Sequence, residues 1–171
     1  MIYTPMTKKA IKIMYDAHKD QVDKAGMPYV LHPIHVAEQM QDEDRTIVAL
    51  LHDVVEDTNM TFEKLTEYGF SSNVIESLKL LTHSNDVGYF EYVKEIGTNP
   101  ISTSVKLADL RHNSDLSRLD VVTDEDLKRV QKYQKCINYL ESMQKVQNGS
   151  LAPDASEIQE FEMNIDTGYT R

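Results

Sequence analysis

One stretch of the chain, residues 50–58, constrains the fold more than any other. It reads Leu50-Leu51-His52-Asp53-Val54-Val55-Glu56-Asp57-Thr58, so one imidazole and three carboxylates lie within an otherwise apolar segment. With about 100° of rotation per residue, a helix places the ionisable side chains on one face and the leucines and valines on the other. The sequence therefore predicts a buried amphipathic helix from about residue 45 to residue 56.

The polar face of this predicted helix favours a metal site. Neighbouring carboxylates repel one another unless a cation lies among them, and no lysine or arginine stands in residues 50–58. Imidazole nitrogen and carboxylate oxygen together suit a first-row divalent ion. The alternative is a solvated helix face, and further ligands elsewhere in the chain are needed to decide between the two.

Two residues far along the chain are candidates for those further ligands. His32 precedes Pro33 at a loop-to-helix junction, where the proline fixes the following backbone angle; the alternative is an ordinary residue at a helix start. Asp109 shares a helix face with Lys106 and Asn113 by three- and four-residue spacing. The alternative for Asp109 is a surface pair with Lys106, but its apolar neighbours predict burial, and a buried carboxylate needs a partner or a metal.

The remaining histidines of these two segments receive no role in the site. His35 lies in the helix predicted from Pro33 to about residue 42, with no acidic companion, and is interpreted as structural or solvated. His112 is expected to point away from the face of Asp109.

Apolar residues recur at helical spacing along most of the chain. Thr4-Pro5 and Thr123 with Asp126 predict the starts of the first and last long helices. The sequence predicts an all-α fold, a single helical bundle of about seven to eight helices that occupies residues 1–147. Residues 148–171 are acidic and polar and are expected to form a C-terminal tail, either flexible or docked through Ile158, Phe161 and Met163.

Composition excludes several classes of protein. The formal net charge of −10 argues against binding to nucleic acid or anionic membranes but is compatible with a small phosphorylated substrate. No apolar run approaches the roughly 18 residues of a membrane span. Cys136 is the only cysteine, so neither an intramolecular disulfide nor a cysteine zinc site is expected. The amino terminus lacks a signal-peptide pattern, so we expect a cytoplasmic location.

The order His32, His52-Asp53, Asp109 resembles the pattern of the HD phosphohydrolase superfamily. The wider segments, residues 24–33, 51–58 and 105–113, resemble the hydrolase domain of RelA/SpoT-type alarmone enzymes, in particular the stand-alone small alarmone hydrolases. The resemblance covers about residues 5–147. It implies an HD-domain bundle that removes the 3′-pyrophosphate of a (p)ppGpp- or (p)ppApp-type nucleotide.

The resemblance also implies roles for individual residues. His32, His52, Asp53 and Asp109 would bind one divalent ion, manganese in this family, and Glu56 and Asp57 match the pair that activates water. Lys24 and Asn113 match nucleotide contacts, and Arg129 and Tyr133 resemble residues near the phosphates and base. Lys106, on the helix face of Asp109, completes the substrate-binding candidates.

Two departures from the family pattern affect substrate choice. Asp23 stands where guanine-binding members usually have an arginine that stacks on the base, so adenine alarmones remain an alternative. Leu110-Arg111 replaces the usual Arg-Leu order, so a basic contact is expected to have moved.

Other functions remain as alternatives. One is a different nucleotide phosphatase, acting on NADPH or nucleoside monophosphates, and another is a non-catalytic nucleotide sensor. A two-iron oxygenase would need more histidines between Asp53 and Asp109, where only His83 lies. The expected partner is a small nucleotide, and a homodimer is compatible with the sequence.

Overall fold

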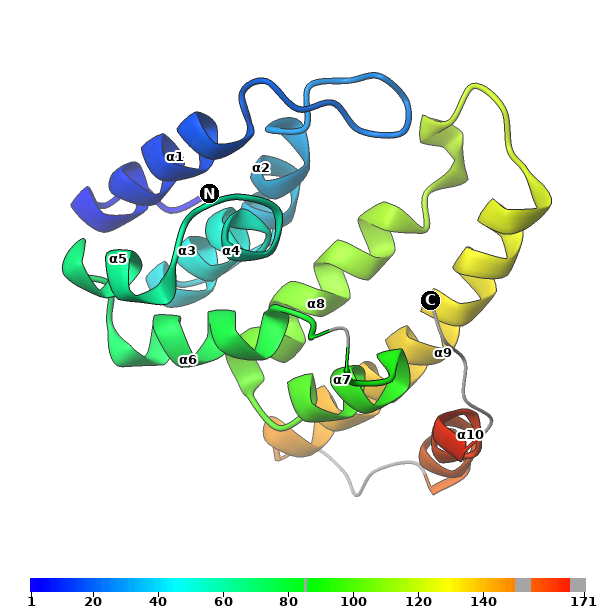
Figure 1. The fold of residues 1–171 in the computed structure, drawn as a ribbon. Coiled ribbons are helices and arrows are strands. Elements are labelled where there is room, and N and C mark those ends of the chain that lie inside the picture. Colours follow the sequence, from blue (N-terminus) through cyan, green and yellow to red (C-terminus); the bar gives the residue numbers. More distant parts are fainter. Residues whose placement is uncertain (85, 150–154, 167–171) are drawn as a thin grey trace.

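The computed structural model describes residues 1–84, 86–149 and 155–166, and in these residues every regular element is helical (Figure 1). The all-α prediction is confirmed. An isolated antiparallel bridge joins Val22 and Pro28 in the loop after the first helix. The helices are α1 (Pro5–His18), α2 (Leu31–Glu38), α3 (Glu43–Leu51), α4 (Val54–Asp57), α5 (Phe62–Glu67), α6 (Ser72–Leu81), α7 (Tyr89–Ile96), α8 (Pro100–Asn113), α9 (Asp124–Gln147) and α10 (Ala155–Asp166), with a 3-10 turn at Leu116–Arg118.

The predicted starts of α1 and α9 are confirmed, and side-chain caps explain both. Thr4 caps α1 in a reciprocal pair with Thr7, and Pro5 occupies the first helical position. Thr123 caps α9 in the same way with Asp126. Such caps satisfy backbone N–H groups that have no partner within the helix, which fixes where each helix begins.

The predicted continuous helix over residues 45–56 is wrong. Helix α3 ends at Leu51, and α4 starts at Val54 after a turn at His52 and Asp53. In a continued helix the Asp53 N–H would bond the Ala49 carbonyl, but the His52 ring donates its Nδ1–H to that oxygen, at 2.8 Å. The side chain thus competes with the helical hydrogen bond. The second helix also begins at Leu31, two residues earlier than predicted.

Helix α3 is enclosed by its neighbouring helices. Its residues from Thr46 to Leu51 are all buried, and α1, α2, α6 and α8 pack around it (Figure 1). Because interiors pack as densely as organic crystals, the C-terminal end of α3 is held rigidly from several sides. This end carries His52.

The segment predicted as a tail contains α10, which packs on α7 and α9. Phe161 is 1% exposed and stacks on the Tyr139 ring at a centroid distance of 4.0 Å. Ile158 is partly buried against the core, whereas Met163 is 57% exposed. Two of the three residues proposed to dock this segment therefore contact the body. Residues 150–154 and 167–171 of the predicted tail lie outside the described residues.

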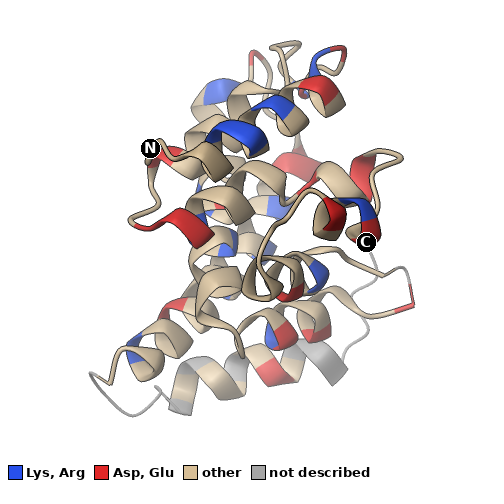
Figure 2. Cartoon of the chain, turned by 90° about the vertical axis from the view of Figure 1, so that its left-hand side faces the viewer, with Lys and Arg blue, Asp and Glu red and all other residues tan. Residues whose placement is uncertain are grey.

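Charged residues of both signs are interspersed over the helices in the view of Figure 2. Within the described residues, no helix combines the length and the apolar character needed to span a membrane.

Candidate metal centre and active site

Three helices bring the predicted metal ligands together. His32 comes from the first turn of α2, His52 from the C-terminal end of α3, and Asp109 from α8. One ligand atom of each lies within 4.8 Å of the others. The Nε2 atoms of His32 and His52 are 3.3 Å apart, and Asp109 Oδ1 lies 3.2 Å from His32 Nε2. All three residues are buried.

Asp53 joins this cluster because the helix breaks before it. Its Oδ2 lies 2.9 Å from His52 Nε2 and 3.7 Å from His32 Nε2. On an uninterrupted helix, consecutive side chains diverge by about 100°. The turn at His52 and Asp53 instead directs both to the same point.

The hydrogen bonds outside the cluster determine which atoms face its centre. His52 Nδ1 donates to the Ala49 carbonyl, so the neutral ring presents a bare Nε2. Arg118, which can only donate, lies 3.2 Å from His112 Nδ1. His112 Nδ1 therefore accepts hydrogen bonds. His32 Nδ1, which lies 2.7 Å from it, carries a hydrogen and donates it to His112. His32 also presents a bare Nε2.

The cluster of His32, His52, Asp53 and Asp109 therefore consists of converging hydrogen-bond acceptors. Two imidazole nitrogens and two carboxylate oxygens lie 2.9 to 4.0 Å apart across it. Acceptors at such distances repel unless positive charge lies between them. A nitrogen-and-oxygen donor set of this kind fits one divalent ion.

The pKa shifts of the cluster residues also indicate that positive charge is favoured at this point. Burial lowers the pKa of His52, but the carboxylates of Asp53 and Asp109 outweigh it and raise that pKa to about 9. Burial raises the pKa of Asp53, yet the neighbouring His52 brings it down to about 2. A bound metal would supply this charge in place of protons, because metal ligands bind in their deprotonated forms.

Neighbouring side chains orient the two carboxylates. Lys106 Nζ lies 2.9 Å from Asp109 Oδ2, and Asn113 donates to Asp109 Oδ1 at 2.5 Å. The Tyr29 hydroxyl donates to Asp53 Oδ2 at 2.5 Å. Such outer partners fix the direction of metal ligands. Lys106, predicted to bind substrate, is thus paired with Asp109, whose carboxylate overcomes the effect of burial and raises the pKa of Lys106.

A cavity of about 260 Å³ opens beside the cluster. Asp53, Glu56 and Asp109 line it. The His83 backbone N–H donates to Glu56 Oε2 at 3.0 Å and holds this carboxylate. Asp57 does not line the cavity; burial raises its pKa, and the nearby carboxylates of Asp53 and Glu56 add to that effect. Of the two predicted acids, Glu56 is therefore the one that faces the cavity.

A second pocket of about 390 Å³ adjoins this cavity, and Tyr29, Asn113 and Tyr133 line both. Lys24 and Arg129 line the second pocket, and Lys106 lines the first. All five predicted substrate contacts thus border one of the two spaces. Arg129 is paired with Asp126 at 2.8 Å, and the side chain of Lys24 is 71% exposed.

Asp23, the departure from the family pattern, has a defined place in the second pocket. Its carboxylate accepts from the backbone N–H groups of Ala25 and Met27, which closes the loop. The Arg118 guanidinium donates to its other oxygen at 2.7 Å. An arginine from the 3-10 turn therefore lies beside position 23, although the sequence alone did not select Arg118.

The prediction that His112 points away from the site is wrong, since its Nδ1 lies against His32. His112 follows Asp109 by three residues, the same spacing that places Lys106 beside Asp109 on one helix face. The sequence pattern therefore already indicated that His112 lies on the side of the site. The His35 ring stacks on His112 with centroids 4.2 Å apart, which agrees with its structural interpretation. Tyr29 was also missed as a contact of the cluster; it precedes His32 by three residues.

Comparison with known proteins places these features in a family. The family model described as "HD domain" matches residues 10–112 of this chain. The chain is 33% identical over 96 residues to a guanosine-3′,5′-bis(diphosphate) 3′-pyrophosphohydrolase of Aquifex aeolicus, a match that covers 54% of this chain and 13% of that protein. It is 31% identical over 143 residues to a probable enzyme of the same name from Synechocystis sp., covering 75% of this chain and 19% of the relative.

A solved structure agrees with the fold. It is described as a metazoan ortholog of SpoT that hydrolyses ppGpp, and it matches with a TM-score of 0.67 at 23% sequence identity. The match covers 96% of this chain and 97% of that chain. The chain spans less than a fifth of the length of the two bacterial relatives above. The matched residues 10–112 include His32, His52, Asp53 and Asp109, and this chain belongs to the HD domain family.

Proposed function

We propose that this protein is a metal-dependent phosphohydrolase that removes the 3′-pyrophosphate of an alarmone nucleotide of the (p)ppGpp or (p)ppApp type. The observation that carries the proposal is a cluster of acceptors that opens onto a cavity faced by Glu56. It consists of the buried His32, His52 and Asp109 with the partly buried Asp53. The names of the bacterial relatives support the substrate class.

We assign the cluster to one divalent ion, manganese. Bound there, such an ion lowers the pKa of a coordinated water and neutralises charge that develops on a phosphate. His32, His52, Asp53 and Asp109 would hold the ion, and Lys106, Asn113 and Tyr29 orient the two carboxylates for it.

Glu56 is the proposed general base. It lines the cavity beside Asp53 and Asp109, and the His83 backbone N–H keeps its carboxylate in place. Glu56 takes a proton from the attacking water as the water oxygen bonds to the phosphorus and the bond between that phosphorus and the 3′ oxygen breaks. The departing 3′ oxygen takes up a proton, so the products are pyrophosphate and a nucleotide that keeps its 5′ phosphates and has a free 3′-hydroxyl. Asp57, outside the cavity, is proposed to support Glu56 rather than replace it.

The second pocket is the proposed place of the remainder of the nucleotide. Lys24 and Arg129 supply positive charge for 5′ phosphates, and Asn113 and Tyr133 lie where the two spaces meet. Asp23 and Arg118 together face the base, and this pair replaces the single arginine expected of guanine-binding relatives. Guanine and adenine alarmones are therefore both substrates to test.

The net charge of −10 supports a small nucleotide rather than nucleic acid as the partner. A cytoplasmic location and a homodimer complete the proposal.

The test is mass spectrometry of products after incubation of the purified protein with manganese and ppGpp, ppApp, NADPH or a nucleoside monophosphate. We expect pyrophosphate and a nucleoside 5′-diphosphate from ppGpp or ppApp. Inorganic phosphate from NADPH or a monophosphate would instead identify the other phosphatase activity. Nucleotide binding without turnover in manganese would identify a sensor.

A further inference from the structure

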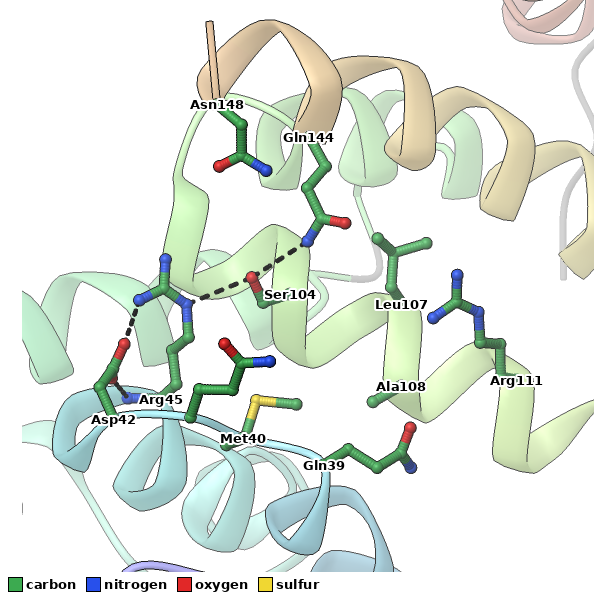
Figure 3. Close-up of a pocket in the computed structure, with 11 residues that line it drawn as sticks. Gln39, Met40, Asp42, Arg45, Ser104, Leu107, Ala108, Arg111, Gln144 and Asn148 are labelled. Atoms are coloured by element: carbon green, nitrogen blue, oxygen red, sulfur yellow. Dashed lines mark hydrogen bonds and ion pairs between the residues drawn. The ribbon is translucent and has the colours of Figure 1, made fainter. Parts of the chain in front are cut away.

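A pocket of about 470 Å³ lies apart from the metal cluster and shares no lining residue with the two spaces described above. Figure 3 shows it between α8, the end of α9 and the start of α3. Arg45 and Arg111 line it from different helices. Met40, Leu107 and Ala108 give it an apolar floor.

Arg45 is held in place by its neighbours. Its Nη1 is paired with Asp42, and its Nε donates to Ser104 Oγ at 3.3 Å. Gln144 donates to the same hydroxyl at 3.3 Å, while Ser104 donates to the Pro100 carbonyl at 2.8 Å. Figure 3 shows the guanidinium anchored at Asp42 and Ser104. A guanidinium with fixed geometry loses less entropy when it binds an anion.

Arg111 supplies the second positive charge. Its Nη2 is paired with Glu141 at 2.6 Å, and the Arg111 side chain is 53% exposed. Glu141 itself does not line the pocket. An anion in the pocket would therefore compete with Glu141 for this guanidinium.

Asp42 and Ser104, the two partners of Arg45, also line the pocket, and the rest of the lining consists of amide side chains, namely Gln39, Gln41, Gln144 and Asn148. An amide both donates and accepts, which matches the edge of a nucleobase. The volume lies in the range of small-molecule sites, about 300–1,000 Å³, and is larger than a phosphate ion alone requires. Guanidinium groups suit phosphate, because they form parallel charge-assisted hydrogen bonds to its oxygens.

We propose that this pocket is a second ligand site, which binds a small phosphorylated nucleoside. The phosphate lies at the Arg111 guanidinium, the base contacts the amides, and the apolar floor covers one face of the ring. The position of this pocket also suits regulation of the metal cluster by the bound ligand. Its walls include Gln39, Arg45 and Ala108, and these residues cap or belong to α2, α3 and α8, the helices that carry His32, His52 and Asp109.

The experiment is a titration of the isotope-labelled full chain with adenosine or guanosine 5′-monophosphate, followed by backbone amide signals in nuclear magnetic resonance. Inorganic phosphate is the reference. We expect the signals of Ser104, Leu107 and Gln144 to move in a saturable way, with much weaker binding of phosphate alone. Signals of Glu56 and Asn113 report the metal-side cavity separately, so the result does not depend on the proposed hydrolysis.

Matched variants sharpen this test. Arg111→Gln should weaken binding tenfold or more, because a charge-assisted contact is lost. Glu141→Gln should strengthen it several-fold, because the competing carboxylate is gone. Arg111 is half exposed, so its variant is expected to fold, and a thermal unfolding midpoint checks this.

Three results would overturn the proposal. Shifts confined to Glu56 and Asn113 would place all nucleotide binding at the metal-side cavity. Unchanged nucleotide affinity in both Arg111→Gln and Glu141→Gln would exclude a contact between the nucleotide and the Arg111 guanidinium. Equal affinity for phosphate and for the nucleotides would exclude recognition of the nucleoside.

Discussion

The Nε2 atoms of His32 and His52 lie 3.3 Å apart, and both present a lone pair to the same point. Two bare imidazole nitrogens cannot hydrogen-bond each other, and the carboxylate oxygens beside them only accept. The arrangement is stable when a cation or protons occupy the centre.

Removal of divalent metal should destabilise the protein. Metal at about a hundred times its dissociation constant contributes roughly 2.7 kcal/mol to the folded state. For a chain of this size that corresponds to a shift of about 5–10 °C in the unfolding midpoint. Thermal scans with manganese and with a chelator measure it. His52→Ala should abolish the difference, and an unchanged midpoint in the wild type would refute metal binding here.

Glu56→Gln should lower turnover of the alarmone by about two to four orders of magnitude if Glu56 is the general base. The metal should still bind, since Glu56 is not one of the four cluster residues. Steady-state kinetics and calorimetric titration with manganese separate the two effects. Asp57→Asn is the matched control and should lose less activity, because Asp57 does not line the cavity. A larger loss in the control would reverse the assignment.

Lys106→Met should destabilise the fold by an amount that depends on metal. The side chains of Lys106 and Asp109 are 14% and 6% exposed, and removal of one partner of a buried ion pair costs about 3–5 kcal/mol. Bound metal should reduce this cost, because it also neutralises Asp109. Urea unfolding with and without manganese measures the difference. Lys94→Met is the control, since its ion pair with Glu162 is exposed and should contribute less than about 1 kcal/mol.

Phe161→Ala should cost about 3–5 kcal/mol, because a fully buried aromatic side chain leaves a cavity when it is truncated. Phe161 stacks on Tyr139 and meets the Phe90 ring edge-on at a centroid distance of 5.3 Å. Met163→Ala, on the same helix but 57% exposed, should change stability by less than about 0.5 kcal/mol. Equal effects of the two substitutions in chemical denaturation would show that α10 does not dock in solution.

The thiol of Cys136 should make stability fall at high pH. Burial raises its pKa from 9.0 to about 12, so the folded state keeps the proton when the unfolded chain has lost it. The stabilising contribution is complete below pH 9 and is lost as the pH rises toward 12, with a slope of at most ~1.4 kcal/mol per pH unit. Denaturant unfolding at pH 8 and pH 10 should show a smaller decline in Cys136→Ala than in the wild type. Parallel declines would contradict a buried thiol.

Local patterns predicted much of this protein. The caps at Thr4 and Thr123 were readable because capping involves residues three positions apart. The donor types at His32, His52, Asp53 and Asp109 pointed to a divalent ion because ligand chemistry is a property of the side chain itself. These features of the sequence do not depend on which helices meet.

Only the tertiary structure decided the rest. The turn at His52 and Asp53 arises from a ring hydrogen bond to Ala49, which periodicity does not show. The approach of Arg118 to Asp23 and of His112 to His32 joins segments 95 and 80 residues apart. Whether Glu56 or Asp57 faces the cavity depends on the direction in which α4 leaves that turn. These outcomes depend on which helix faces meet, and the energetics of that packing are not encoded in any single segment.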